Sequence, residues 1–213
     1  MQIDKAIQLA ADYVEVRFDF IDPNDLPYAI AATRNIKRKA VFTMRSRSEG
    51  GRFPLSEEER LLWLSKLANE RPMLLDVEFE TLRKNDSLLD YIEEQNVPIL
   101  VSWHDFSQTP SSDKILEILS EMRIYSNYIK LVTTARSTED SLRLLEISKR
   151  IPNVHAIIFA MGEAGVISRI LCTIIGDAPF TYASLEKAVV PGQLTLDQMK
   201  SLYDSILARF QSN

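Results

Sequence analysis

The sequence predicts an α/β fold, a single (β/α)8 TIM barrel whose first strand is very short or missing. Three observations support this class. Short β-branched or aromatic runs recur at a period of about 28 residues, segments with helical spacing lie between them, and charged side chains gather near the ends of the runs. Alternating strands and helices are typical of a parallel sheet covered by helices.

Seven runs are expected to form strands because of their length and their content of β-branched and aromatic residues. They span residues 13–19, 40–45, 73–79, 98–105, 127–134, 155–161 and 180–184. Helical spacing is clearest in residues 56–69, where Ser56 precedes three glutamates, the pattern of an N-cap and first turn. Further helices are expected at residues 112–126, 138–150 and 195–210.

The count of elements leaves the N-terminal seam of the barrel undecided. A first helix is expected at residues 3–11, and only Met1, Gln2 and Ile3 remain for the strand that should precede it. Either a very short strand closes the barrel there, or the chain begins further upstream, or the barrel is open at this seam. No Pro- or Gly-rich linker interrupts the chain, so we expect one domain over residues 1–213.

The placement of charge favours a barrel over an open, doubly wound sheet. Charged side chains at every second position share one face of a strand. Two runs carry such sets: Glu15, Arg17 and Asp19, and Asp76, Glu78 and Glu80. Ser102 and His104 form a similar pair in a third run. Barrel enzymes place their chemistry at the carboxyl ends of the strands, which accounts for charge at these positions.

Composition excludes several classes of protein. With 46% hydrophobic and 26% charged residues, the 213-residue chain has a globular composition. A net charge of −5 argues against a general affinity for nucleic acid or anionic membranes, and no apolar run is long enough for a membrane span. The single cysteine, Cys172, cannot form an internal disulfide, which fits the cytoplasm. Two histidines and one cysteine are too few for an ordinary structural zinc site.

Lys130 lies in the middle of an expected strand, among apolar neighbours. Burial without a partner lowers the pKa of a lysine from about 10.4 toward neutrality. The neutral amine is a nucleophile that forms Schiff bases with carbonyl compounds. The alternative is an ion pair between Lys130 and Glu78 or Glu15 on another strand.

His104 lies at the end of the preceding strand. Neighbouring strands are about 5 Å apart, so His104 and Lys130 are expected to face one small volume, where the histidine would act as a general acid–base. The alternative is a core histidine with satisfied hydrogen bonds. His155 begins its strand at the opposite end of the barrel, which is typical of a stabilising role.

Three loops carry further candidates. Residues 45–51 contain Arg45, Glu49 and two glycines, and form either a ligand-binding loop or a solvated charged loop. Residues 161–169 end in Arg169 and suit phosphate or carboxylate, without the spacing of nucleotide-binding motifs. Residues 188–193 form either a lid or a simple turn.

Together these segments resemble the type I 3-dehydroquinate dehydratases, in the family order and over nearly the whole chain. The resemblance rests on motifs that contain Glu15, Arg17 and Asp19; Arg45, Glu49, Gly50 and Gly51; Ser102, His104 and Asp105; Lys130; Met161, Gly162, Gly165, Ser168 and Arg169; Pro191, Gly192 and Gln193. It implies a (β/α)8 barrel and a homodimer without metal or cofactor. It also implies dehydration of 3-dehydroquinate to 3-dehydroshikimate in the shikimate pathway.

The resemblance also implies a role for each residue. Lys130 corresponds to the imine-forming lysine, His104 to the general acid–base and Glu49 to the carboxylate that positions the histidine. The residues that correspond to the binding site for the ring hydroxyls are Glu15, Arg17 and Arg45. The remaining substrate-binding residues are Arg169 and Gln193 for the carboxylate, and Met161 and Tyr182 for the ring.

In the implied reaction, Lys130 condenses with the ketone, and His104 removes the neighbouring proton and then protonates the departing hydroxyl. We expect the Glu49 carboxylate to raise the basicity of the histidine. Val189 departs from the family pattern, because a serine that binds the carboxylate is common there. A Schiff-base aldolase would explain Lys130 but not His104 together with Arg45 and Glu49. A non-catalytic barrel that binds a hydroxylated carboxylic acid is the other alternative.

Overall fold

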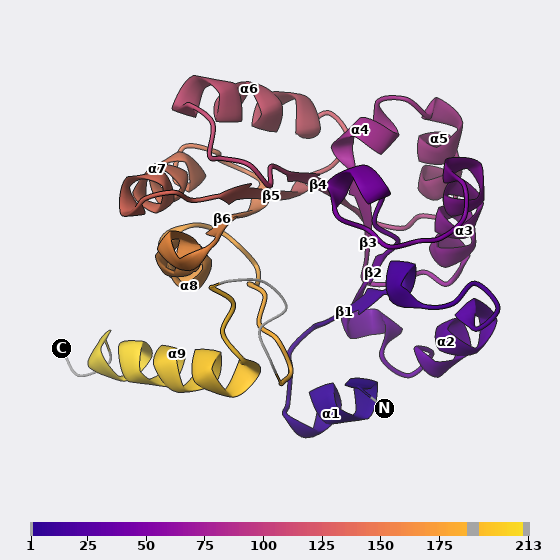
Figure 1. Cartoon of the computed structure of the whole chain (residues 1–213), viewed down its shortest axis with the longest axis horizontal. Coiled ribbons are helices and arrows are strands. Elements are labelled where there is room, and N and C mark those ends of the chain that lie inside the picture. Colours follow the sequence, from indigo (N-terminus) through magenta and orange to yellow (C-terminus); the bar gives the residue numbers. More distant parts are fainter. Residues whose placement is uncertain (1, 187–191, 211–213) are drawn as a thin grey trace.

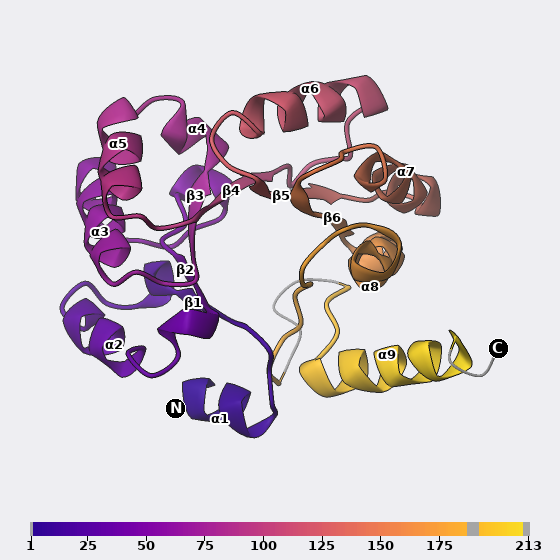
Figure 2. The same ribbon diagram turned by 180° about the vertical axis from the view of Figure 1, so that it is seen from behind.

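The computed structural model describes residues 2–186 and 192–210, and its centre is one parallel sheet. Six strands follow one another in chain order, and the sheet curls into a half-barrel with helices on its outer side (Figures 1 and 2). The strands are β1 (Val14–Arg17), β2 (Ala40–Thr43), β3 (Leu74–Glu78), β4 (Ile99–His104), β5 (Tyr128–Thr134) and β6 (His155–Met161). The alternation of strand and helix is confirmed.

The helices are α1 (Gln2–Gln8), α2 (Leu26–Ala32), α3 (Glu57–Asn69), α4 (Phe79–Leu82), α5 (Asp86–Glu94), α6 (Ser112–Met122), α7 (Thr138–Ser148), α8 (Val166–Ile175) and α9 (Leu196–Phe210). Those from α2 to α7 lie between successive strands and cover the convex face of the sheet, α8 follows β6, and α1 and α9 lie at the open side of the half-barrel (Figure 1). Ser56 caps α3 as predicted. Its hydroxyl accepts a hydrogen bond from the Glu59 backbone N–H, and the Glu59 carboxylate accepts one from the Ser56 N–H.

The prediction of a seventh strand at residues 180–184 is wrong. The segment makes only an isolated bridge between Ser184 and Thr195. The Ser184 backbone binds the carbonyl of Leu194 and the N–H of Leu196, so its hydrogen bonds go to the next segment rather than to β6. An aromatic run predicts burial equally well for an irregular segment, and Phe180 does pack inside the curled sheet.

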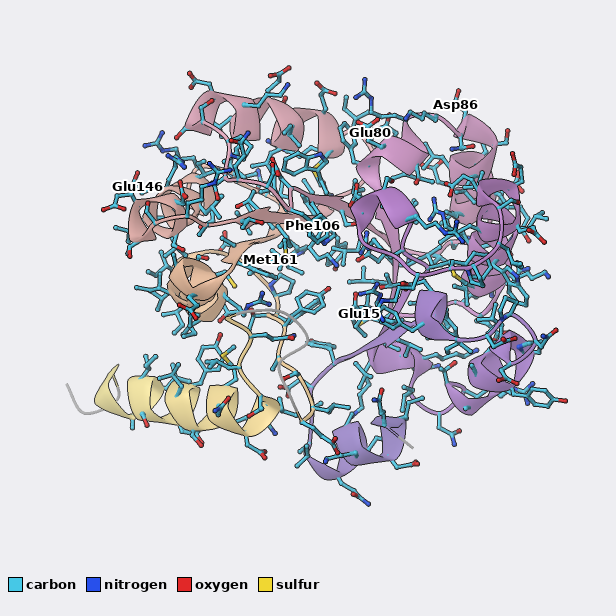
Figure 3. All side chains as sticks on the ribbon, in the orientation of Figure 1. Glu15, Glu80, Asp86, Phe106, Glu146 and Met161 are labelled. Atoms are coloured by element: carbon cyan, nitrogen blue, oxygen red, sulfur yellow. The ribbon has the colours of Figure 1, made fainter. Side chains whose placement is uncertain are left out.

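The first four strands also end earlier than predicted, and β2 ends at Thr43, which places Arg45 after the strand. β1 ends at Arg17, and Asp19 lies in the following 3-10 helix, η1 (Phe18–Phe20). β3 ends at Glu78, so Glu80 lies on α4, exposed and paired with Arg83. Figure 3 shows Glu80 at the periphery, while Glu15 points into the interior of the half-barrel. Glu80 therefore does not share the inner face with the other acidic residues.

Between β1 and β6 the sheet is not continuous, and α1 occupies the place before β1 where the first strand was sought. No strand precedes β1 in the part of the chain that the structure describes. Contacts across this seam join the two ends of the chain: the rings of Tyr13 and Phe180 lie 5.2 Å apart, and the Lys200 Nζ donates to the carbonyls of Leu9 and Ala10.

The two faces of the sheet bury two different sets of side chains. Outward-facing residues such as Phe42, Leu75 and Val101 pack against the helices in the larger apolar core. Inward-facing residues form a second apolar cluster, the inner floor, which contains Val41, Leu74, Leu100, Val132, Ile157 and Phe159. Alternation along each strand produces this division. On β2, β3 and β4 the next inward positions toward the carboxyl ends are polar, namely Thr43, Asp76 and Ser102, and with Lys130 on β5 they build the candidate site.

Candidate active site

Lys130 projects from the middle of β5 into the half-barrel, and only 4% of its surface is exposed. Its Nζ donates to Asp76 Oδ2 at 2.6 Å and lies 3.6 Å from Glu15 Oε1. The nitrogen also lies 4.8 Å from the centre of the Tyr182 ring. Of the two partners expected for this lysine, Glu15 is therefore present, but the closest carboxylate belongs to Asp76 and not to Glu78.

Arg45 follows β2, is buried, and binds the same carboxylate as Lys130, that of Asp76. Its guanidinium donates to Asp76 Oδ2 at 2.7 Å and to the Ser102 hydroxyl, which in turn donates to Asp76 Oδ1 at 2.6 Å. Burial alone would raise the pKa of Asp76, but Arg45 and Lys130 hold it well below its usual range. Asp76 therefore remains a carboxylate shared by two buried cations.

His104, at the end of β4, pairs with Glu49. The distance between His104 Nδ1 and Glu49 Oε2 is 2.7 Å. Burial, mainly, raises the pKa of Glu49 to about 8, and burial together with Arg45 and Lys130 lowers the pKa of His104 well below its usual value. Burial and the two cations therefore determine the direction of the His104 pKa shift, and the expected contribution of Glu49 to the basicity of the histidine stays a prediction.

The loop after β2 positions Glu49 through a tight turn. The 3-10 helix η3 (Arg47–Glu49) is closed by N–H groups of Glu49 and Gly51, which both donate to the carbonyl of Ser46. Gly50 has a φ of +80°, and a Cβ on Gly51 would lie 1.9 Å from the Arg45 carbonyl oxygen. Both glycines are needed to fold Glu49 back toward the sheet.

Glu15 and Arg17, on β1, diverge although they share a face. Glu15 accepts a hydrogen bond from the Thr43 hydroxyl at 3.0 Å and faces Lys130. Arg17 forms a bidentate pair with Asp19 at 2.8 and 2.7 Å, and its guanidinium lies over the Phe20 ring. A third of the Arg17 side chain remains accessible, so it borders the site at the rim.

Arg169 lies on α8, across the site, with its guanidinium 4.2 Å from the centre of the Phe159 ring. Burial lowers the pKa of Arg169 to about 10, and its Nε has no hydrogen-bond partner among the described residues. The buried Tyr182 hydroxyl likewise lacks a partner within the described part of the chain. The Arg169 Nη1 donates to the Tyr182 carbonyl at 3.4 Å, so the two unpaired atoms belong to residues in contact and are suited to a polar ligand.

The other predicted substrate contacts lie around the same opening. Met161 ends β6 and packs against the inner floor, pointing into the interior (Figure 3). Gly192, beside Gln193, has a φ of +76°, and a Cβ there would lie 2.2 Å from the Gly162 carbonyl oxygen. The segment that carries Gln193 thus lies against the loop after β6. Val189 and most of the expected lid, residues 187–191, lie outside the described residues.

Comparison with known proteins assigns the family. A sequence model described as type I 3-dehydroquinase matches residues 1–209. The chain belongs to this family. The family predicted from the sequence motifs is therefore confirmed, together with the enzyme class, a dehydratase, and the barrel fold class.

Relatives with known names match this chain over nearly its whole length. The 3-dehydroquinate dehydratase of Dehalococcoides mccartyi is 40% identical over 199 residues, which are 92% of this chain and 86% of the relative. The solved structure of the 3-dehydroquinate dehydratase from Aquifex aeolicus has a TM-score of 0.81 at 30% identity and covers 95% of this chain and 91% of its own. The enzyme from Geobacillus kaustophilus gives 0.86 at 27% identity, with coverage of 96% and 84%.

Sequence reasoning missed part of the charge network of the site. It marked Asp76 and Ser102 as inward-facing but assigned them no role, and it did not consider Arg60. Register supplies the missing information: Thr43 pairs with Asp76, and Ser102 pairs with Lys130. Among the described residues there is no group of three or more histidines, cysteines or acidic residues that could hold a metal ion, and no helix long and apolar enough to cross a membrane.

Proposed function

We propose that the protein dehydrates 3-dehydroquinate to 3-dehydroshikimate, in the shikimate pathway, through a Schiff base on Lys130. The observation that carries this proposal is the placement of a buried lysine beside a histidine–glutamate pair. Ser102 pairs with Lys130 in register, and His104 lies two residues further along the same strand, toward the open end of the half-barrel. The names of the relatives and the family support the same substrate.

The first step joins the Lys130 amine to the substrate ketone and releases water, which leaves a protonated imine. The attacking amine must be neutral, so its proton has to leave the ion pair with Asp76 and Glu15. Two carboxylates beside Lys130 then stabilise the positive charge of the imine. Arg45 keeps Asp76 ionised for this purpose.

The second step uses His104 and Glu49 as one acid–base unit. With its Nδ1 proton donated to the Glu49 carboxylate, His104 can take the proton from the carbon beside the imine through Nε2. The Nδ1 proton can then pass to the ionised Glu49 carboxylate. Because the pKa of Glu49 is about 8, this ionised form becomes the larger population only above that pH, and we expect the rate of the step to rise with pH through that value. Returning a proton to the departing hydroxyl releases water, and hydrolysis of the imine frees Lys130 and the product.

Binding groups surround these reacting residues. Arg169, with its unpaired Nε, and Gln193 are assigned to the substrate carboxylate, while Met161 and Tyr182 are assigned to the ring. The ring hydroxyls are assigned to Glu15, Arg17 and Arg45. The scheme needs neither a metal ion nor a cofactor, as the resemblance implies.

Trapping with borohydride tests the proposal. Borohydride reduces an imine to a stable amine, so incubation with 3-dehydroquinate should add the reduced substrate to the intact mass, and peptide mapping should place it on Lys130. Lys130→Met serves as the control and should show neither adduct nor turnover. Turnover by Lys130→Met at the wild-type rate would sink the imine mechanism. Binding without turnover in the wild type would instead favour the non-catalytic barrel.

The homodimer and the cytoplasmic location stay predictions of the resemblance. Gel filtration should give a mass near twice the 24.3 kDa of the chain, and a clear monomer would remove the dimer.

A further inference from the structure

Arg60 is a charged side chain buried in the apolar outer layer of the protein. It lies on the first turns of α3, and 2% of its surface is exposed. Its Nη1 donates to the Met44 carbonyl at 2.8 Å and to Glu78 Oε2 at 3.0 Å, and its Nη2 donates to the Thr81 hydroxyl at 2.8 Å. Burying a guanidinium is costly, and these contacts offset that cost.

Glu78 connects Arg60 with the candidate active site. One carboxylate oxygen faces Arg60, and the other accepts the Ser46 N–H at 2.7 Å and lies 3.5 Å from Arg45 Nη1. The same Arg45 nitrogen lies 3.8 Å from Glu49 Oε2. An unbroken series of contacts therefore leads from a helix outside the sheet to the acid–base pair inside it.

We propose that Arg60 is a positioning residue for the dehydration, acting through Glu78 on residues 44–49, which carry Arg45 and Glu49. Arg60 contacts this segment in two ways. It donates directly to the Met44 carbonyl, and it binds the Glu78 carboxylate, which in turn accepts the Ser46 N–H. Arg60 touches neither Lys130 nor His104 by any hydrogen bond or ion pair among the described residues. The proposal rests on the function proposed above.

The positive charge of Arg60 also affects the protonation of the His104–Glu49 pair, because it offsets the negative charge of Glu78. Glu49 is faced by Arg45 after β2, by Asp76 and Glu78 on β3, by His104 on β4 and by Lys130 on β5. Glu78 and Asp76 favour the protonated form of Glu49, whereas Arg45 and Lys130 oppose it. Without Arg60, the carboxylate of Glu78 loses its nearest cation, and its negative charge favours protonation of Glu49 further.

The test compares Arg60→Met with wild type by kinetics and by proton NMR. In Arg60→Met, kcat should fall at least about tenfold with KM within about threefold, because the substrate groups are kept and the reacting groups are misplaced. The apparent pKa of the His104–Glu49 pair, followed by the His104 ring resonance, should rise by about half a pH unit or more. The chain has only two histidines, and His155 provides an internal reference far from the site.

Two further variants make the outcome decisive. Arg60→Lys keeps a charge near Glu78 and should restore the pKa of the pair while recovering only part of kcat, because a lysine lacks the guanidinium fork. Glu57→Gln removes the exposed partner of Arg60 and should leave kcat and the titration unchanged. If Arg60→Met does not fold, as judged by circular dichroism, Arg60→Lys alone decides through its lowered kcat.

The proposal is overturned if folded Arg60→Met keeps the wild-type kcat and the wild-type titration of His104. It is also overturned if activity falls only in proportion to the fraction of folded protein, because that result assigns Arg60 to stability alone. The titration does not depend on turnover. An inactive wild type with a changed titration in Arg60→Met would therefore reject the proposed function and still place Arg60 in control of the acid–base pair.

Discussion

Asp76 is the carboxylate on which the charge layer of the site depends. It accepts hydrogen bonds from Lys130, Arg45 and Ser102, which come from three different strands or their ends. One negative charge held between two buried cations would lose both if it were protonated, which is why the pKa of Asp76 is low. The orientation of the lysine amine is therefore fixed by a residue that makes no reaction step of its own.

Glu49 provides a prediction about pH and stability. Its pKa is about 8 in the folded chain and about 4.3 in an unfolded chain, so folding favours the protonated form. The stability gained in this way is complete below about pH 4 and is lost as the pH rises through 8. Glu49→Gln cannot ionise, so its stability relative to wild type should increase by up to about 1.4 kcal/mol for each pH unit across that window.

Urea unfolding of both proteins at about pH 5, 7 and 9 measures this difference. A difference that stays constant with pH would show that the Glu49 carboxyl titrates in the folded chain as it does in water. Activity is a separate readout, because the amide introduced by Glu49→Gln cannot exchange a proton with His104.

For individual residues of the site, the sequence predicts which residue types are present better than it predicts their contacts. The strand position of Lys130 and the motif that carries His104 and Glu49 are visible in the chain. The choice of Asp76 rather than Glu78 as partner is not visible, because it depends on the register between strands. Arg60 lies on a helix whose start is strongly acidic, which on sequence grounds is typical of a solvated face.

Among the elements, the loop after β2 depends most on backbone geometry. It leaves the sheet at Thr43, reverses within residues 46–51 and returns Glu49 to His104. Gly51 lies so close to the carbonyls of Arg45 and Ser46 that any side chain there must displace the turn. The position of Glu49 beside His104 therefore depends on the conformation of this one turn at the end of β2.

Gly51→Ala should destabilise the fold by about 2 kcal/mol, because the new methyl group meets backbone atoms that cannot yield cheaply. It should also lower kcat, since Glu49 moves with the turn. Thermal unfolding and steady-state kinetics measure the two effects. Ser48→Ala, in the same exposed turn, is the matched control and should stay close to wild type in both. Wild-type kcat in Gly51→Ala would separate the turn from catalysis.

Six of the seven strands could be predicted because their runs are short, apolar and regularly spaced. The seventh could not, because the backbone partners of residues 180–184 come from residues 194–196, and no local pattern shows this. Tyr182 nevertheless reaches the inner face, packing beside the inner floor. Tyr182 therefore lies on the inner side of the sheet although the segment that carries it is not a strand.

Over the whole molecule, the open seam is bridged by side chains rather than by a sheet. Tyr13 packs near Phe180, Lys5 pairs with Glu186, and Lys200 binds the carbonyls that follow α1. The figures show α1 and α9 on the same side of the half-barrel, at this seam (Figures 1 and 2). We therefore expect the N-terminal segment around α1 and the C-terminal segment that carries α9 to stabilise each other.

We expect residues 1–213 to unfold as one domain because of these contacts. Trp63 and Trp103 report on the N-terminal half by fluorescence, whereas far-ultraviolet circular dichroism reports on all helices. The two signals should give coincident urea transitions. In Phe180→Ala the transitions should stay coincident and move to lower urea. Two separated transitions in the wild type would divide the chain into independent units.

The division of side chains between the two faces of the sheet has a consequence for how such a protein can evolve. The outer face holds the helices and carries most of the apolar core, and the inner face holds the charges that act on a substrate. Neighbouring residues along one strand are therefore under different selective pressures, because they lie on opposite faces of the sheet. Inner-face positions can drift toward a new ligand while their immediate neighbours keep the architecture unchanged.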